Sequence, residues 1–305
     1  MTFVVLAILA GTLAGVATER RLGERAVLGT RRLIGVLLWT VLPFIYFFTI
    51  TRLEVDASVG GGLALSHATL ALTGALAWFV GSSVLKLGAA GTGALILTVV
   101  IANTGYLGIP LSSTLYGEEG LGQAVAYDAL VNTPIFLTVG LAIGAGLGTR
   151  AGTTGRERFR AFLRGNPPLV AVVAGLLAPA SASPDLLHDA AEALAFAVLP
   201  VGFFIVGVTL ASEADEGTTA FPPPFDRTVA IAIGLRLLVA PLLLLGLSAL
   251  TLDVPDAFVV EMAMPTGVNA LVVGHAYGLD LRLASSALAY STAIAVIAVL
   301  GIGLI

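Results

Sequence analysis

The sequence predicts an all-α protein with many membrane-spanning helices, and its composition, the length of its apolar runs and two helix-breaking motifs lead to that prediction. Of the 305 residues, 57% are hydrophobic and only 11% are charged, which is far more apolar than a soluble globular domain. A bilayer core of roughly 30 Å needs about 20 apolar residues in each helical span, and the chain divides into ten such candidates.

The ten candidate spans follow one another with short connections, and the first, sixth and seventh are the shortest. We expect the first to be a true span, because the chain opens without the basic segment that precedes the apolar run of a cleaved signal peptide. The spans are expected at residues 2–17, 33–50, 63–85, 89–115, 121–147, 168–181, 196–210, 229–250, 258–277 and 283–305.

Basic residues predict the orientation of the chain. They cluster after the first span and after the fifth, and such loops remain on the cytoplasmic side. An even number of spans then places both termini outside, in the plasma membrane, with Arg52 as the one clear cation on the outer side. The two clusters are Arg20, Arg21, Arg25, Arg31 and Arg32, and Arg150, Arg156, Arg158, Arg160 and Arg164.

Several classes of function are disfavoured by what the sequence lacks. It contains no cysteine, which excludes disulfides, thiolate catalysis and cysteine-ligated metals. It has no HExxH, no Gly-x-Ser-x-Gly, no paired transmembrane aspartates and no phosphate-binding loop of an ATPase. We therefore expect neither an enzyme nor a cofactor, a metal site or a nucleic-acid partner.

Weak internal matches at a nearly constant offset indicate a duplicated unit of five spans. Because five is odd, the second copy must enter the membrane from the opposite side, and inverted repeats of this kind are typical of secondary transporters. The predicted organisation is a first repeat at 1–148, a cytoplasmic linker at 149–166 and a second repeat at 167–305. The matches are Val41-Leu42-Pro43 with Val198-Leu199-Pro200, Thr104-Gly105 and Tyr116-Gly117 with Thr266-Gly267 and Tyr277-Gly278, and Ala10-Gly11 with Ala174-Gly175.

The fourth and ninth spans are predicted to be broken, at 103–111 and 264–270. Both motifs combine proline, glycine and asparagine, and irregular backbone at membrane depth is tolerated only inside protein or beside a wet cavity. The amino-terminal ends of the resulting half-helices present free amide donors, for which a carboxylate is the natural ligand. Asn103 and Asn269 can each donate and accept hydrogen bonds there.

At these residues the chain resembles the auxin efflux carrier family, which holds the plant PIN carriers and bacterial or archaeal carriers of small organic acids. The resemblance rests on Asn103-Thr104 with Gly108-Ile109-Pro110-Leu111, and on Pro265-Thr266-Gly267-Val268-Asn269-Ala270 with Tyr277-Gly278. It implies ten helices in two inverted repeats, a scaffold that can dimerise, and a transport domain that works by elevator-like alternating access.

The resemblance also implies a substrate site where the fourth and ninth helices cross. Carried over to this sequence, its binding residues are Asn103, Pro110 and Asn269, with Thr104 and Ala270 beside them. The second crossover proline of the plant carriers falls at Ala270, which leaves the position of the break in the ninth helix open.

Ionisable residues inside the spans are candidates for ion coupling, since they are costly at membrane depth. Asp128 is either a proton carrier or a carboxylate near the membrane face that is solvated or capped. Glu261 either binds a cation with Asn269, eight residues away on the same helical face, or lies at the interface.

Three basic side chains also fall within the predicted spans. His275 lies nearest the crossover and has the better claim to a coupling role. It and His67 are expected to be hydrogen-bonded interior histidines, because neither has a second metal ligand at helical spacing. Arg236 is expected to snorkel to the inner face, with pairing to a carboxylate or to an anionic substrate as the alternative.

The function expected from these observations is secondary transport of a small carboxylate across the lipid bilayer. An auxin-like aromatic monocarboxylate and a malonate- or malate-like dicarboxylate both fit, and the lack of a second cation at the site favours the monoanion. The alternative is a sodium-coupled symporter of the bile-acid type, which shares this architecture and for which Glu261 and Asn269 would be the supporting features.

Overall fold

The structure is a computed structural model that describes residues 2–54, 56–149, 167–215 and 223–302. These residues are helical nearly throughout, and the β-structure among them is one isolated antiparallel bridge. The predicted linker at 149–166, with its five arginines, lies outside the described residues except for Thr149.

The part of the chain before the linker forms the following elements, with π-helical and 3-10 stretches marked η. They are α1 (Thr2–Leu22), α2 (Glu24–Val36), η1 (Leu37–Val41), α3 (Leu42–Ile50), α4 (Ala57–Phe79), η2 (Val80–Val84), α5 (Ala89–Val100), η3 (Thr104–Gly108), α6 (Ile109–Tyr127), η4 (Asp128–Asn132), α7 (Thr133–Ile135), η5 (Phe136–Gly140) and α8 (Leu141–Leu147).

The part after the linker is also helical. Its elements are α10 (Pro167–Leu177), η6 (Ala180–Ala182), α11 (Asp185–Asp215), α12 (Arg227–Gly234), η7 (Leu235–Val239), α13 (Ala240–Leu250), α14 (Asp256–Met262), α15 (Val268–Tyr277) and α16 (Leu281–Ile302).

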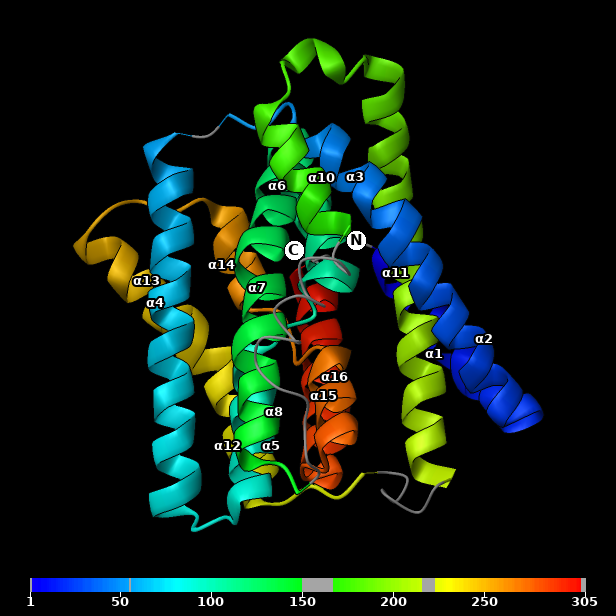
Figure 1. Cartoon of the computed structure of the whole chain (residues 1–305), viewed down its shortest axis with the longest axis vertical. Coiled ribbons are helices and arrows are strands. Elements are labelled where there is room, and N and C mark those ends of the chain that lie inside the picture. The colour runs from blue at the N-terminus through cyan, green and yellow to red at the C-terminus, as the bar shows by residue number, and fades with distance from the viewer. Residues whose placement is uncertain (1, 55, 150–166, 216–222, 303–305) are drawn as a thin grey trace.

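Six described helical runs are long and apolar enough to cross a bilayer, which confirms an all-α membrane protein. The longest, Thr104–Leu147, is interrupted at Gly117, whose φ of 65° and ψ of −145° turn the chain back on itself. Only glycine adopts a positive φ without strain, so this run contains two helices that lie antiparallel. The α3–α4 connection, this bend and η6 lie at the upper end in Figure 1, and the α4–α5 and α15–α16 connections lie at the lower end.

The helices pack in two groups. In the first group, which comprises α1, α2, α3, α10 and α11, α1 lies along α11, and α3 packs on α10 and α11. In the second group α5 packs on α4 and α16, α14 packs on α6, and α12 packs on α16. The groups meet where α3 and α11 contact α6 and where α11 contacts η3 (Figure 1). Further contacts join α1 and α11 to α16, and α10 to η4, so the contact between the groups follows one of the two broken helices only in part.

The fourth and ninth spans are both broken, but the first break lies earlier than predicted. It covers 101–103 and shares only Asn103 with the predicted 103–111, while residues 104–111 are helical. Helix α5 ends at Val100 and the next helical run begins at Thr104 with η3, so Pro110 lies inside this run, directly after its π-helical turn. Proline lacks the amide hydrogen of a helical bond, and such interruptions of the helical ladder are commonly found beside a π-helical turn. In the ninth span the helix is interrupted at 263–267. Ala270 lies in the first turn of α15, so the break rests on Pro265 and Gly267.

Candidate functional site

The two breaks lie side by side near the middle of the molecule and pair through their backbones (Figure 1). The Asn103 N–H donates to the Pro265 carbonyl at 2.8 Å, and the Gly267 N–H donates to the Ile101 carbonyl at 2.9 Å. A Cβ at Gly267 would collide with the Ala102 carbonyl, so close pairing requires glycine here. The two bonds satisfy backbone groups that the interrupted helices leave free in an apolar environment.

The Asn132 side chain pairs with the other edge of the first break. The Ala102 N–H donates to Asn132 Oδ1 at 3.1 Å, and Asn132 Nδ2 donates to the Ala102 carbonyl at 3.3 Å and to Asp128 Oδ1 at 3.2 Å. The side-chain amide thus takes the place of a neighbouring strand. Asn132 was not among the site residues predicted from the sequence, although its position one helical turn after Asp128 places both side chains on one helical face.

Asp128 is 6% exposed and accepts hydrogen bonds from three side chains. The Tyr46 hydroxyl donates to Oδ2, the Thr104 hydroxyl donates to Oδ1, and Asn132 Nδ2 also donates to Oδ1. A Cβ added at Gly105 would lie 3.6 Å from Oδ2, so the carboxylate stands over the start of η3. Asp128 is therefore a buried carboxylate that three side chains cap, and the expectation that it is solvated is wrong.

Glu261 is 0% exposed, in the last turn of α14. Ser112 Oγ donates to its Oε1 at 3.2 Å, whereas Oε2 has no hydrogen-bond partner among the described residues. Its carboxylate fills the space that a side chain at Gly108 would occupy. The interfacial alternative for Glu261 is thus wrong. The break also separates it from Asn269 in α15, so the continuous helical face that was expected to join them does not exist.

The predicted binding residues differ in their surroundings. Asn103 is 4% exposed, and its Nδ2 has no hydrogen-bond partner in the described part of the chain. Thr104, the next residue, is buried, and so is Pro110, about two helical turns further along. Asn269 is half-buried at the second position of α15, and Ala270 is buried at the third. The structure thus brings Asn103 and Thr104 to the crossover, next to the amino-terminal ends of two half-helices.

The two histidines predicted to be interior are exposed. His275 lies in the last turn of α15, away from the break. His67 lies on the surface of α4, where its Nδ1 is 2.8 Å from the Leu63 carbonyl. Neither belongs to a cluster of metal-ligating side chains among the described residues. The spacing of residues along each helix did not show that the two histidines lie on faces that point away from the protein.

Arg236 lies at the opposite, carboxyl-terminal side of the crossover and is 0% exposed. Its Nε donates to the Met264 carbonyl at 2.8 Å, its Nη1 to the Val99 carbonyl at 2.8 Å and its Nη2 to the Met262 carbonyl at 2.5 Å. The expectation that Arg236 snorkels to the membrane face is wrong. One guanidinium instead caps the carboxyl-terminal ends of both α5 and α14.

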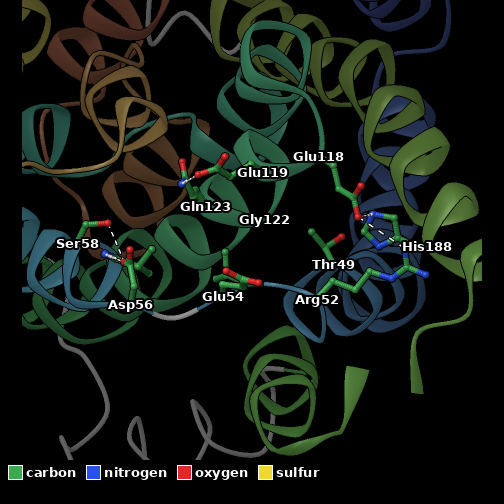
Figure 2. A pocket seen from close by; sticks show the side chains of 12 residues that line it. Thr49, Arg52, Glu54, Asp56, Ser58, Glu118, Glu119, Gly122, Gln123 and His188 are labelled. Atoms are coloured by element: carbon green, nitrogen blue, oxygen red, sulfur yellow. Dashed lines mark hydrogen bonds and ion pairs between the residues drawn. The ribbon is translucent and has the colours of Figure 1, made fainter. Parts of the chain in front are cut away.

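A polar pocket of about 480 Å³ opens at the end of the molecule where α3 leads into α4 (Figure 2). Thr49, in its wall, lies about one helical turn from Tyr46 on α3, so the pocket approaches the tyrosine that binds Asp128. Its lining residues are Thr49, Arg52, Leu53, Glu54, Asp56, Ser58, Val59, Glu118, Glu119, Gly122, Gln123 and His188.

Glu118 links the two helix groups at this pocket. Figure 2 shows the His188 ring and the Arg52 side chain converging on its carboxylate. His188 Nε2 lies 3.0 Å and Arg52 Nη1 lies 3.6 Å from Glu118 Oε1. Because Arg52 and His188 belong to the first group and Glu118 follows the bend in α6, the contacts bridge the groups.

Apolar helices, two of which are interrupted and cross at a buried polar centre, are the architecture of a membrane transporter. The family described as membrane transport protein matches residues 162–302. An uncharacterized transporter of Methanocaldococcus jannaschii is 24% identical over 269 residues, which cover 84% of this chain and 83% of that protein. An uncharacterized transporter of Methanothermobacter thermautotrophicus is 30% identical over 213 residues, which cover 66% and 64%.

The carboxyl-terminal half of the chain thus matches the membrane transport protein family, the family of the auxin efflux carriers, and both similar archaeal proteins are named as transporters. The resemblance inferred from the crossover motifs is thereby confirmed.

Proposed function

We propose that the protein is a secondary carrier of a small organic anion and that the substrate binds at the crossover. The observation that carries the proposal is the Asn103 side chain, whose buried Nδ2 has no partner among the described residues. An unsatisfied buried donor costs roughly 1–3 kcal/mol. A substrate carboxylate would satisfy it and would also meet the free amides of the adjacent half-helix ends.

The wider architecture that we propose has ten spans in two inverted repeats of five, with both termini outside the plasma membrane. The reciprocal bonds from Asn103 to Pro265 and from Gly267 to Ile101 support it, because equivalent breaks of two inverted repeats would pair in this way. The group of α1, α2, α3, α10 and α11 would be a scaffold, which can form a homodimer. The other helices would move against it in alternating access.

Asp128 is the group that we propose couples transport to protons. Its carboxylate lies over the start of η3, the same half-helix end that an anion beside Asn103 would use. Two carboxylates at one end repel each other. Protonation of Asp128 would remove that repulsion, so the anion and a proton would bind together and leave together.

Sodium coupling is the second candidate, and the unpartnered Glu261 Oε2 favours it. A buried carboxylate oxygen without a donor is a suitable ligand for a hard cation. Replacement of sodium by choline in a proteoliposome uptake assay separates the two candidates. Uptake that continues with a proton gradient alone supports proton coupling, and strict dependence on sodium supports the symporter.

The carrier proposal is tested by uptake of radiolabelled indole-3-acetate and malonate into proteoliposomes that contain the purified protein. We expect saturable uptake, with a preference for the monoanion, that Asn103→Ala weakens. Gln123→Ala is the matched control, since that amide binds Glu119 on an exposed surface at 2.9 Å. Absence of saturable uptake of either anion, under proton and sodium gradients alike, would refute the proposal.

A further inference from the structure

Broken helices create two kinds of end at the crossover, and the carboxyl-terminal ends need a positive group. The last carbonyls of a helix have no intrahelical donor and carry partial negative charge. In transporters with interrupted helices such carbonyls coordinate an inorganic cation. Here α5 ends at Val100 and α14 ends at Met262, both deep in the protein.

In this chain a side chain reaches these carbonyls. Arg236 donates one hydrogen bond to α5, through Val99, and two to the α14 end, through Met262 and Met264. It comes from η7, a π-helical stretch in the middle of an apolar run of the second group. The rigid planar fork of a guanidinium can reach several carbonyls at once, which the single ammonium of lysine cannot match.

The charge of Arg236 is balanced by these carbonyls rather than by a contact ion pair. No carboxylate lies within 4 Å of it in any ion pair of the described residues. Glu261, equally buried, attracts it from a greater distance. A fully buried guanidinium without a close counter-charge is costly, and the partial negative charge of these carbonyls offsets that cost.

We propose that Arg236 is a tethered cation that replaces an inorganic coupling ion at the carboxyl-terminal ends of the two broken helices. The inference rests on the proposed carrier function and deepens it, because it assigns transport without sodium to this site. Arg236 is a positioning residue. It holds Met264, which precedes the Pro265 whose carbonyl fixes Asn103.

The experiment compares the wild-type protein with Arg236→Met and Arg236→Lys in proteoliposomes. Uptake of indole-3-acetate and malonate is measured with sodium, with choline, and with added guanidinium chloride at millimolar concentration. Arg282→Met is the matched control, because Arg282 is exposed and forms a surface pair with Asp226 at 3.3 Å. The melting temperature of each variant is measured with the same cations, which requires no substrate.

We expect wild-type uptake to be equal in sodium and choline. Arg236→Met should lower it by about tenfold or more, since one hydrogen bond from a charged group is worth at least that factor. Free guanidinium should restore part of the uptake and raise the melting temperature of Arg236→Met only. Arg236→Lys should fold and show an intermediate defect. A role confined to packing would not produce rescue by the cation.

The results that would contradict the inference about Arg236 differ from those that would contradict the carrier proposal. Wild-type uptake that requires sodium would overturn the tethered-cation inference and leave the carrier proposal standing. So would normal uptake by Arg236→Met, or a folded Arg236→Met variant that guanidinium neither rescues nor stabilises. Should Arg236→Met fail to fold, the cation dependence of the wild type and of Arg236→Lys decides. Lack of any anion uptake by the wild type would instead refute the carrier proposal.

Discussion

Asn132 and Ala102 exchange a reciprocal pair of hydrogen bonds at 3.1 and 3.3 Å, in which a side-chain amide takes the part of a β-strand. The break between α5 and η3 is therefore held on one edge by this amide and on the other by the backbone of the second break. Both edges are needed because the segment lies at a depth where water does not replace a missing partner.

Replacement of Asn132 by leucine should destabilise the protein. The change leaves the N–H and the carbonyl of Ala102 without their partner, and each unsatisfied buried group costs roughly 1–3 kcal/mol. We expect a clearly lower melting temperature in detergent. Gln123→Leu, which removes an exposed amide, is the control and should change the melting temperature little. Equal stability of the Asn132 variant and the wild type would show that the pair contributes nothing.

Substitution of Asn103 should have opposite effects on the stability of the free protein and on its affinity for an anion. Asn103→Ala removes a buried Nδ2 that has no partner, so the free protein should keep or gain stability. Binding of a carboxylate should weaken by roughly 1–3 kcal/mol. Asn269→Ala should weaken binding by less, because that side chain is half-buried. The measurements are thermal unfolding without anion and a binding titration with indole-3-acetate.

Two outcomes would contradict this view of Asn103. One is a large loss of stability without anion, which would mean that the amide has a structural partner. The other is unchanged affinity in both asparagine variants, which would remove the crossover as the binding site.

Asp128→Asn should abolish the dependence of transport on a proton gradient. The neutral amide can still bind Tyr46, Thr104 and Asn132, but it cannot take up a proton. We expect uptake by the variant to be insensitive to the gradient between about pH 5 and about pH 8. The measurement is the initial rate of uptake with and without an imposed gradient. A variant whose rate still follows the gradient would assign proton coupling to another group.

The interrupted helices of this site could be predicted from the sequence, because the residues that interrupt a helix act through their own backbone conformation. Proline, glycine and asparagine in 103–111 and 264–270 disfavour a continuous helix whatever lies around them. The ninth span is broken at 263–267, over most of its motif, whereas the fourth is broken at 101–103, just at the start of its motif. Asn103 and Thr104 reach the crossover for the same reason. Pro110 is an exception, since it lies inside the helical run that follows the break and not in the break itself.

The contacts made between elements could not be predicted from one segment at a time. Arg236 is buried only because the ends of α5 and α14 converge on it, and Tyr46 finds Asp128 only because α3 packs on α6. The prediction that Glu261 and Asn269 share one helical face was wrong, because helical periodicity does not continue across a break. His67 and His275 are on outward faces, which apolar spans do not reveal because both lipid and protein favour apolar residues.

The Asp56 carboxylate should make the start of α4 sensitive to acid. Its Oδ1 accepts from the Val59 N–H at 2.9 Å and from the Ser58 hydroxyl at 2.8 Å, and these bonds lower the pKa of Asp56. Because the pKa is lowered, the ionised carboxylate stabilises the fold fully at a pH above its pKa in the unfolded chain, about 3.9. This stabilisation is lost as the pH falls through the pKa in the folded protein. Asp56→Ala should therefore reduce the melting temperature at about pH 7 and differ little from the wild type near about pH 2.5.

Asp56→Asn is the companion variant, because its amide oxygen can still cap the helix at every pH. Its difference from Asp56→Ala should persist into acid. A wild-type advantage over Asp56→Ala that does not shrink as the pH falls would exclude the ionised carboxylate as its source.

The ion pairs of Glu118 should open whenever the two helix groups move relative to each other. Arg52 and Glu118 come from different groups, whereas Arg282 and Asp226 form an ion pair within one group. Because the chain has no cysteine, a cysteine pair can be introduced at either place and joined by a short bifunctional thiol reagent. We expect the link between residues 52 and 118 to stop uptake of indole-3-acetate, and the link between residues 226 and 282 to leave it unchanged relative to the same variant without reagent. A protein linked between 52 and 118 that transports at the unlinked rate would show that this end of the two groups stays fixed, and alternating access would then require motion elsewhere.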